Sequence, residues 1–430
     1  MPLAKLILPL KGKLARKKER DISCSSEHKH NQTSQLCDLP AEMIDLIASF
    51  LERHDLCMLR LTCSALRSTS KYQFGRIGLH TLRTDLSKAN MSAMAELANA
   101  CGYNHHVKRL YICGSSGCYL GYGFSWIRDF WSNRYLIWLL TSEGFLRLRA
   151  LLEKFPNCQS FHVSLSEEPE EGAWKDCISP SDAIVVLLNL MSCMARPVKS
   201  FTCSHSDPKE QLPGIISSKN FSSRHFDDAR LSITLSTLTE LAILAYIKND
   251  ALANFVCNFA SQASNLKKLE LDFAAGSGAP TVMQQLGSGS SLVKLEELKL
   301  SNALGISGHD LYKVLLENCA SLRILSLKVI CLDDELWETI LDSLMRDFPV
   351  LEEMTLLWIA DRVSGLRELY PGSMYIEGFQ DLRGRHGPIR VFYAGPPVHE
   401  ALSSLLQRYR IPAQQTSRLA AQWPSSRPMI

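Results

Sequence analysis

The most regular pattern in the chain is a repeat of apolar residues in its second half. The spacing Leu-x-x-Leu-x-Leu occurs at Leu266-Leu269-Leu271, Leu295-Leu298-Leu300 and Leu322-Leu325-Leu327, with close variants at Leu238-Leu241-Ile243 and Leu351-Met354-Leu356. The first positions of these five copies lie 28, 29, 27 and 29 residues apart. Alternating leucines predict short strands that bury one face. The nearly constant interval predicts that each strand belongs to a repeated unit.

Weaker copies flank these five. Val107-Leu110-Ile112, Cys158-Phe161-Val163 and Val198-Phe201-Cys203 precede them, and Ile389-Phe392-Ala394 is a degenerate final copy. The second and third weak copies each lie 40 residues before the next one. We therefore expect insertions in the early repeats.

Helix-like segments lie between the strong copies. Apolar residues recur three and four positions apart in Ala251–Ala263, Asp310–Cys319 and Asp334–Phe348. Strand, turn, helix and turn in about 28 residues is a unit that its neighbours must complete, as in a solenoid. The second half is therefore expected to be an α/β fold, with parallel strands backed by helices.

Residues 36–80 have a different, helical pattern. Ile44, Ile47 and Leu51 form one apolar stripe after Pro40, which suits the first position of a helix. Asp55 is a suitable N-cap for a second helix. The apolar residues of that second helix are Leu56, Leu59, Cys63 and Leu66. Two such helices bury too little surface to be stable alone, so a neighbouring domain or a partner must cover them.

These two segments resemble an F-box. A Leu-Pro pair before the first helix, an Ile/Leu stripe and an Asp-Leu pair opening the second helix occur here in that order, beginning with Leu39-Pro40 and ending with Asp55-Leu56. Many F-boxes place a Trp after the second helix, where this chain has Tyr72 and Phe74 as its nearest aromatic residues. The downstream repeats resemble the leucine-rich repeats that often follow an F-box.

The F-box resemblance implies docking on a Skp-type adaptor and, through it, on a cullin of a ubiquitin ligase. The residues expected to face either the adaptor or the module's own core are Leu39, Pro40, Ile44, Ile47, Leu51, Leu56, Leu59 and Leu66. The sequence alone does not show which of these residues face the adaptor and which face the core of the module. The chain would then be a substrate-recognition subunit without catalytic activity. The alternative is a leucine-rich-repeat scaffold that uses its F-box in a non-degradative complex.

The strand residues that flank the inward leucines should form the opposite face of the sheet. That face is predicted to contact the substrate through Lys268, Glu270, Asp272, Glu297, Lys299, Ser326, Lys328 and Glu353, with Ser301, Ile324, Thr355 and Leu357 among them. Such a mixture of charges favours a protein ligand over nucleic acid or lipid. The alternative is that these are ordinary soluble strand residues with no ligand.

Charge is concentrated at the amino end. The formal net charge is +3, yet residues 1–35 carry +5 and the other 395 residues carry −2. A nucleic-acid-binding body is therefore not expected, since phosphate binding needs a concentrated positive face. Residues Leu14–Arg20 fit either a nuclear address or a solvated basic tail. The uncharged run Ala183–Ala195 is too short for a bilayer core, so no membrane association is predicted.

No cofactor, metal or catalytic signature is found. Fourteen scattered cysteines without a Cys-x-x-Cys pair, and no secretory signal, favour reduced thiols in the cytoplasm or nucleus. The clusters Cys24/His28/His30/Cys37 and His105/His106/Cys113/Cys118 lack the paired spacing of a zinc site. We expect neither to bind metal.

An aromatic insertion lies between the first two weak repeats. It runs from Tyr119 to Trp138 and contains eight aromatic residues. It suits either a lid packed on the early repeats or a surface for a partner. The expected organisation is a basic tail (1–35), the F-box (36–80), the first weak repeat with this insertion (81–150), the solenoid (151–410) and a polar tail (411–430).

Overall fold

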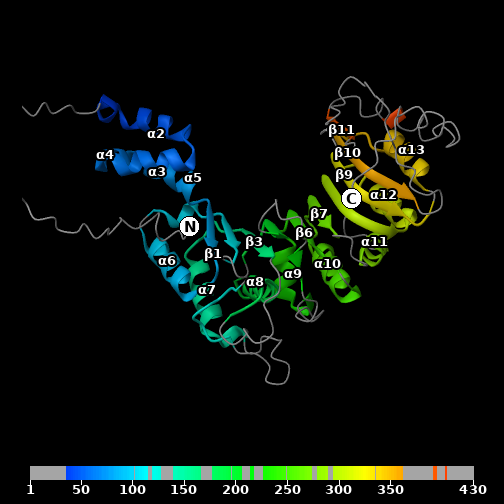
Figure 1. Ribbon diagram of the computed structural model, residues 1–430, viewed down its shortest axis with the longest axis horizontal. Helices are drawn as coiled ribbons and strands as arrows, with labels where there is room; N and C mark the ends of the chain where they lie inside the picture. The colour runs from blue at the N-terminus through cyan, green and yellow to red at the C-terminus, as the bar shows by residue number, and fades with distance from the viewer. Residues whose placement is uncertain are drawn as a thin grey trace, which may run out of the picture.

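The computed structural model describes most of the chain as an elongated arc (Figure 1). The described residues are 35–100, 102–114, 119–126, 139–165, 177–194, 196–205, 214–216, 226–247, 249–273, 278–288, 294–334, 336–361, 391–394 and 402–403. Nearly all of the predicted N-terminal tail and the whole C-terminal tail lie outside them.

Short helices form the amino end of the arc. They are η1 (Gln35–Asp38), α2 (Ala41–Ser49), α3 (Arg53–Thr62), α4 (Ser64–Thr69) and α5 (Lys71–Gly78). The predicted start of the second helix at Asp55 is wrong, because α3 already begins at Arg53. That helix also breaks at Cys63, whose backbone is extended and whose Sγ accepts a hydrogen bond from the Leu66 N–H at the start of α4.

Nine parallel strands follow in chain order among the described residues. They are β1 (Thr81–Thr84), β2 (Arg109–Ile112), β3 (Ser160–Leu165), β4 (Ser200–His205), β6 (Glu240–Tyr246), β7 (Lys268–Asp272), β8 (Glu297–Ile306), β9 (Ile324–Leu332) and β10 (Glu353–Asp361). A short β5 (Gly214–Ile215) pairs with β6.

The central residues of the predicted copies pair directly across neighbouring strands. This row is Leu110, Phe161, Phe201, Leu241, Leu269, Leu298, Leu325 and Met354. Leu82 of β1 adds a further member, which the sequence pattern missed. All nine side chains are buried in one continuous apolar core.

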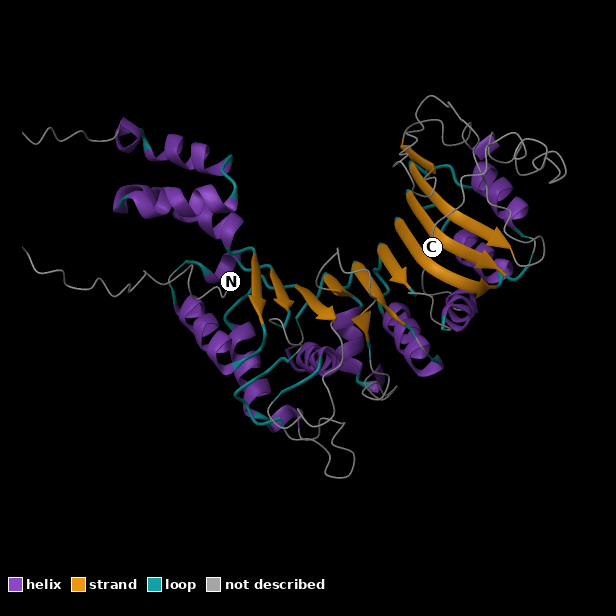
Figure 2. Ribbon diagram, viewed as in Figure 1, coloured by secondary structure: helices purple, strands orange, loops and turns teal. Residues whose placement is uncertain are grey.

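Helices cover one face of the sheet. Those after the early strands are α6 (Lys88–Asn99), α7 (Glu143–Glu153), α8 (Pro180–Met194) and α9 (Ala229–Leu235). Those after the later strands are α10 (Asp250–Gln262), α11 (Ala279–Ser288), α12 (Gly308–Glu317) and α13 (Trp337–Asp347). Figure 2 shows that the strands line the concave side of the arc and the helices its convex side. The architecture is thus a helical N-terminal module followed by a curved α/β sheet.

The degenerate final copy is not another parallel unit. The strand β11 (Val391–Ala394) pairs antiparallel with β10, so that Phe392 lies opposite Thr355. Alternating apolar residues predict a strand but not its direction, and an edge strand can pair either way. The expectation of a further parallel repeat at this position is therefore wrong.

Three residues at an equivalent position relative to β1, β8 and β9 adopt the left-handed backbone conformation. Leu86, Asn302 and Val329 adopt positive φ angles of 58°, 57° and 56°. Each lies five residues after the first residue of its strand. A left-handed conformation costs a residue other than glycine about 1–2 kcal/mol. Leu86 lies two residues after β1 ends, whereas Asn302 and Val329 lie within the longer strands β8 and β9, so the same left-handed residue recurs at the equivalent position of three units.

Candidate interaction surfaces

The N-terminal helices have a small core of their own. Ile44 of α2, Leu56 of α3 and Leu66 of α4 are buried, yet none belongs to the continuous core of the sheet. Gln73 of α5 is also buried, and its Nε2 donates a hydrogen bond to Asp45 Oδ2 at 2.8 Å. This module is therefore stabilised largely by contacts among its own helices.

The structure divides the eight residues predicted to serve the adaptor or the module's own core. Ile44, Leu56 and Leu66 lie in that core, whereas Leu39 and Pro40 are exposed. The remaining three, Ile47, Leu51 and Leu59, are half-buried. Fewer than half of the predicted set are thus fully accessible to a partner.

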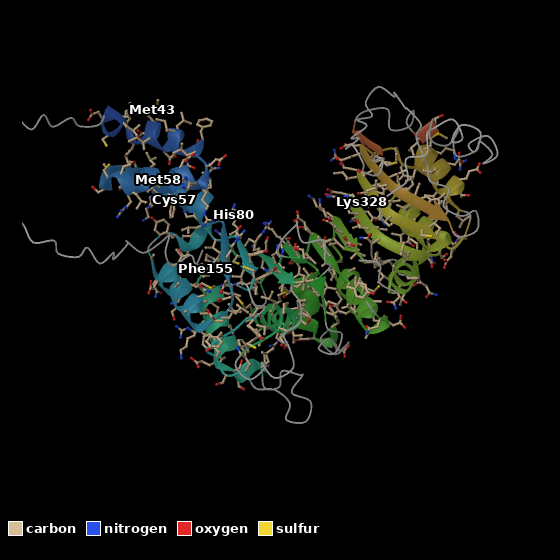
Figure 3. All side chains as sticks on the ribbon, in the orientation of Figure 1. Met43, Cys57, Met58, His80, Phe155 and Lys328 are labelled. Atoms are coloured by element: carbon tan, nitrogen blue, oxygen red, sulfur yellow. The ribbon has the colours of Figure 1, made fainter. Side chains whose placement is uncertain are left out.

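The most exposed apolar side chains of the module are ones that the sequence analysis did not select. Together with Leu39, they form what we call the exposed apolar set: Leu39, Met43, Leu46, Phe50, Met58 and Leu61. Phe50 is 81% exposed. Figure 3 shows Met43 and Met58 on these helices, far along the arc from Lys328.

A second apolar stripe on α2 explains why these exposed residues were not predicted from the sequence. Met43 and Leu46 of α2 and Phe50 at its C-cap are spaced three and four residues apart, which places these three on one side of the helix, and Leu39 immediately precedes the helix. The sequence prediction rests on the neighbouring stripe of Ile44, Ile47 and Leu51 alone. A search for two apolar faces on one short helix would have found both.

Specific contacts join the module to the sheet. Arg60 donates a hydrogen bond to the Tyr103 hydroxyl at 3.0 Å, and its guanidinium lies 4.3 Å from the centre of the Phe74 ring. A Cβ on Gly75 would lie 2.3 Å from the His106 ring, so a glycine is needed for α5 to approach this closely. The last helix of the module is therefore packed directly against the start of the sheet.

The predicted substrate face carries paired charges along its later strands. Lys268 lies 3.7 Å from Glu240 and 3.4 Å from Glu297, and Lys299 also pairs with Glu297. Burial opposes ionisation of Glu297, but the hydrogen bond and charge of Lys299, helped by Lys268, lower its pKa overall. The neighbouring lysines thus hold this carboxylate in its ionised form.

The other predicted residues of this face are mostly accessible. Lys328 is exposed, and Glu270, Asp272 and Glu353 are half-buried. Ser326 differs, because it is only 5% exposed. Its short side chain lies in register between Lys299 and Thr355, so it has little surface to offer a ligand.

The early strands present basic and aromatic side chains, rather than paired charges, on the same face of the sheet. Arg83, Tyr111 and His162 occupy one row across β1, β2 and β3. The Tyr111 and His162 rings meet edge to face at 4.4 Å, and the Arg83 guanidinium lies 5.0 Å from the centre of the Tyr111 ring. Burial lowers the pKa of His162 to about 4, and the charges of Arg109 and Arg83 act in the same direction. His162 is therefore neutral at pH 7.

Part of the aromatic insertion is packed into the molecule. Phe124 and Trp126 are buried in the core of the sheet, and Trp126 Nε1 donates a hydrogen bond to the Gly121 carbonyl at 2.8 Å. Tyr119 and Tyr122 are exposed. Residues 127–138 lie outside the described residues. Residues 119–126 are therefore packed against the sheet, as the lid interpretation predicts, and Tyr119 and Tyr122 remain at the surface.

Neither a metal site nor a membrane-spanning helix is found in the described residues. No three His, Cys, Asp or Glu side chains in this part of the chain are placed to hold a metal ion. Of the two Cys/His clusters, Cys24, His28, His30 and Cys118 lie outside it. No helix there combines the length and apolarity needed to cross a membrane.

Comparison with known proteins places one part of the chain in a family. Residues 36–74 match the family model of the F-box domain, which covers η1 through the first half of α5. No curated protein matches the chain. F-box domains generally bind Skp-type adaptors and act in ubiquitin ligases or in other protein–protein interactions. The helical module with its exposed apolar set is therefore an F-box domain.

Proposed function

We propose that this chain is the substrate-recognition subunit of a Skp/cullin/F-box ubiquitin ligase. The observation that carries the proposal is the F-box domain at residues 36–74 together with the apolar side chains that its helices leave exposed. Full burial of such a side chain contributes about 1.5–3 kcal/mol, and a few central residues often dominate an interface. We assign the exposed apolar set to contact with the Skp-type adaptor.

The curved sheet is proposed to be a leucine-rich-repeat solenoid that binds a protein substrate on its concave side. Its strands pair in chain order, and each strong copy begins 27–29 residues after the previous one. The concave side combines exposed and paired charges, such as Lys268 with Glu240 and Glu297. Such a surface suits the mixed polar and charged surface of a protein.

The proposed role requires no catalytic residue in this chain. Other subunits would carry the activated ubiquitin, and this chain would hold the substrate close to it. The rate increase would come from proximity and orientation. The proposed location is the cytoplasm, the nucleus or both.

The test is recovery of the adaptor and cullin with the tagged full chain from cells. Leu46→Ala/Phe50→Ala/Leu61→Ala removes three members of the exposed apolar set. The matched control, Leu146→Ala/Ile233→Ala/Leu316→Ala, truncates three exposed apolar side chains on α7, α9 and α12. We expect the F-box variant to recover at least tenfold less of both proteins, and the control to match wild type.

Two outcomes would count against the proposal. Equal recovery by wild type and the F-box variant would contradict the role of the exposed apolar set. Recovery of adaptor without cullin from the wild-type chain would instead favour a scaffold that uses its F-box outside a ligase.

A further inference from the structure

Two cysteines of the F-box domain lie with their sulfur atoms close together. Cys37 of η1 and Cys63, between α3 and α4, are 26 positions apart in the chain, yet their Sγ atoms are 3.7 Å apart. Both are free thiols and both are half-buried. A disulfide bond is about 2.05 Å long, so the two sulfurs must approach by roughly 1.7 Å to form one. Rotation of the side chains and a small movement of the four-residue η1 can supply that approach.

The backbone around Cys63 favours the reactive form of its thiol. The chain is extended at this residue, and Cys63 Sγ accepts a hydrogen bond from the Leu66 N–H at 3.5 Å. That hydrogen bond outweighs burial and lowers the pKa of the Cys63 thiol, whereas the hydrogen bond between the two thiols raises the pKa of Cys37. The thiolate is the nucleophilic form of a cysteine. Cys63 should therefore react first, with Cys37 beside it as the second thiol.

Cysteines in the core of the sheet have a different environment. Cys158, Cys203 and Cys257 are buried there, and burial raises the pKa of Cys158 and Cys257 to about 12. Such thiols stay protonated at pH 7 and behave as small apolar residues. The F-box pair differs because both thiols are partly accessible to solvent and the two sulfurs are in contact.

Hydrogen peroxide is an oxidant small enough to reach half-buried thiols. The Cys63 thiolate attacks one peroxide oxygen, the O–O bond breaks, and a sulfenic acid forms as hydroxide leaves. The Cys37 thiol then loses its proton, its sulfur attacks the Cys63 sulfur, and the S–O bond breaks to release a second hydroxide. The two hydroxides take up the two thiol protons as water, and two electrons pass from the sulfurs to the peroxide.

We propose that Cys37 and Cys63 are a reversible oxidation site, at which a peroxide converts the two thiols into a disulfide that joins η1 to the start of α4. Leu39 lies two residues after Cys37, and Leu61 lies two residues before Cys63. The disulfide would therefore form beside the exposed apolar set. This inference goes beyond the proposed function, because the chain alone carries the site.

The test is peptide mapping of the purified full chain after exposure to hydrogen peroxide. Trypsin separates the three cysteines of the F-box domain, placing Cys37 on residues 30–53, Cys57 on residues 54–60 and Cys63 on residues 61–67. We expect the first and third peptides to become disulfide-linked, and dithiothreitol to separate them again. The link should form at least tenfold faster than Cys57, labelled on α3 in Figure 3, loses its free thiol. Tenfold dilution of the chain should not slow it, since both thiols belong to one molecule.

Serine variants assign the roles of the two thiols. In Cys37→Ser, peroxide should leave Cys63 as a sulfenic acid that dimedone labels. In Cys63→Ser, Cys37 should stay unlabelled over the same time. Cys57→Ser is the matched control, because it removes another half-buried thiol of the same domain, and it should form the disulfide at the wild-type rate.

Three results would overturn the proposal. The first is the absence of the linked peptides at a peroxide concentration that oxidises Cys57. The second is a rate that falls on dilution, which would show that the link forms between two chains. The third is dimedone labelling of Cys37 in Cys63→Ser as fast as that of Cys63 in Cys37→Ser. The mapping of the wild-type chain needs no variant, so it decides the proposal even where a serine variant folds poorly.

Discussion

Ile44 of α2 and Phe50 at the end of that helix have opposite environments, which makes their roles separable. Ile44 is 3% exposed and Phe50 is 81% exposed. Ile44→Ala should lower the free energy of unfolding of the F-box domain by about 2–4 kcal/mol, because it leaves a cavity. Phe50→Ala should change it by less than about 0.5 kcal/mol. Hydrogen exchange of the α2–α4 amides measures both values, and equal destabilisation by the two variants would contradict this division.

His162 should make the stability of the sheet depend on pH. Its pKa of about 4 lies below the ordinary value of 6.5, so the unfolded chain binds the proton more readily between these values. Arg83, Arg109 and Ser204 face it from β1, β2 and β4, and none supplies a compensating negative charge. Stability therefore decreases as the pH falls through this window.

His162→Gln should reduce the loss of stability between pH 7 and pH 5 by about 1 kcal/mol, given its partial exposure to solvent. Urea unfolding of wild type and variant at the two pH values measures the difference. His54→Gln, at an exposed site on the F-box domain, is the control. An identical pH dependence in wild type and His162→Gln would show that His162 is not responsible.

At the scale of helices and strands, Asn318 joins the two ends of one repeat, because it connects the end of α12 to Leu295 before β8. It is buried at the end of α12, where its Nδ2 donates to the Val314 carbonyl at 2.8 Å and its Oδ1 accepts from the Leu295 N–H at 2.9 Å. Asn318→Ala leaves that buried N–H without its partner, which should cost about 1–3 kcal/mol.

Urea unfolding followed by circular dichroism tests this link. Asn254→Ala, on the exposed side of α10, is the matched control and should unfold like wild type. If the two variants unfold at the same urea concentration, the Asn318 hydrogen bonds do not stabilise the sheet.

The strands were predictable because their burial follows a simple rule. Leu269, Leu298 and Leu325 alternate with polar residues and recur at a constant interval, so their pattern alone predicts both strand and register. The first strand was missed because its copy lacks the third apolar residue and has Thr84 there. The direction of β11 was not predictable, since alternation is the same for either direction.

The interaction surfaces were predictable only in part. The F-box was identified from its Leu-Pro and Asp-Leu pairs, but which apolar side chains remain exposed depends on how α2, α4 and α5 pack. A pocket lined by Arg53, Arg76, Arg83 and Arg109 at the start of the sheet has no sequence signal. Arg53 and Arg109 are 56 positions apart in the chain, and only the packing of α5 against the start of the sheet places them around one cavity.

At the scale of the whole molecule, the F-box domain and the sheet have separate cores. Ile44, Leu56 and Leu66 lie outside the continuous core that begins at Leu79. Deletion of residues 1–69 should therefore leave the thermal midpoint of the sheet within about 3 °C of its value in the full chain. The helix α5 stays in this variant because Phe74 packs on the sheet core. Calorimetry measures the midpoint, and loss of the cooperative transition would contradict the independence of the two cores.

The central claim is that the exposed apolar set of the F-box domain is a surface that a Skp-type adaptor covers. Hydrogen–deuterium exchange of the full chain, with and without purified adaptor, tests it most directly. We predict slower exchange in α2 and α3 on addition of adaptor and no change in β6–β10. Unchanged exchange in α2 and α3, or slower exchange confined to the sheet, would contradict the claim.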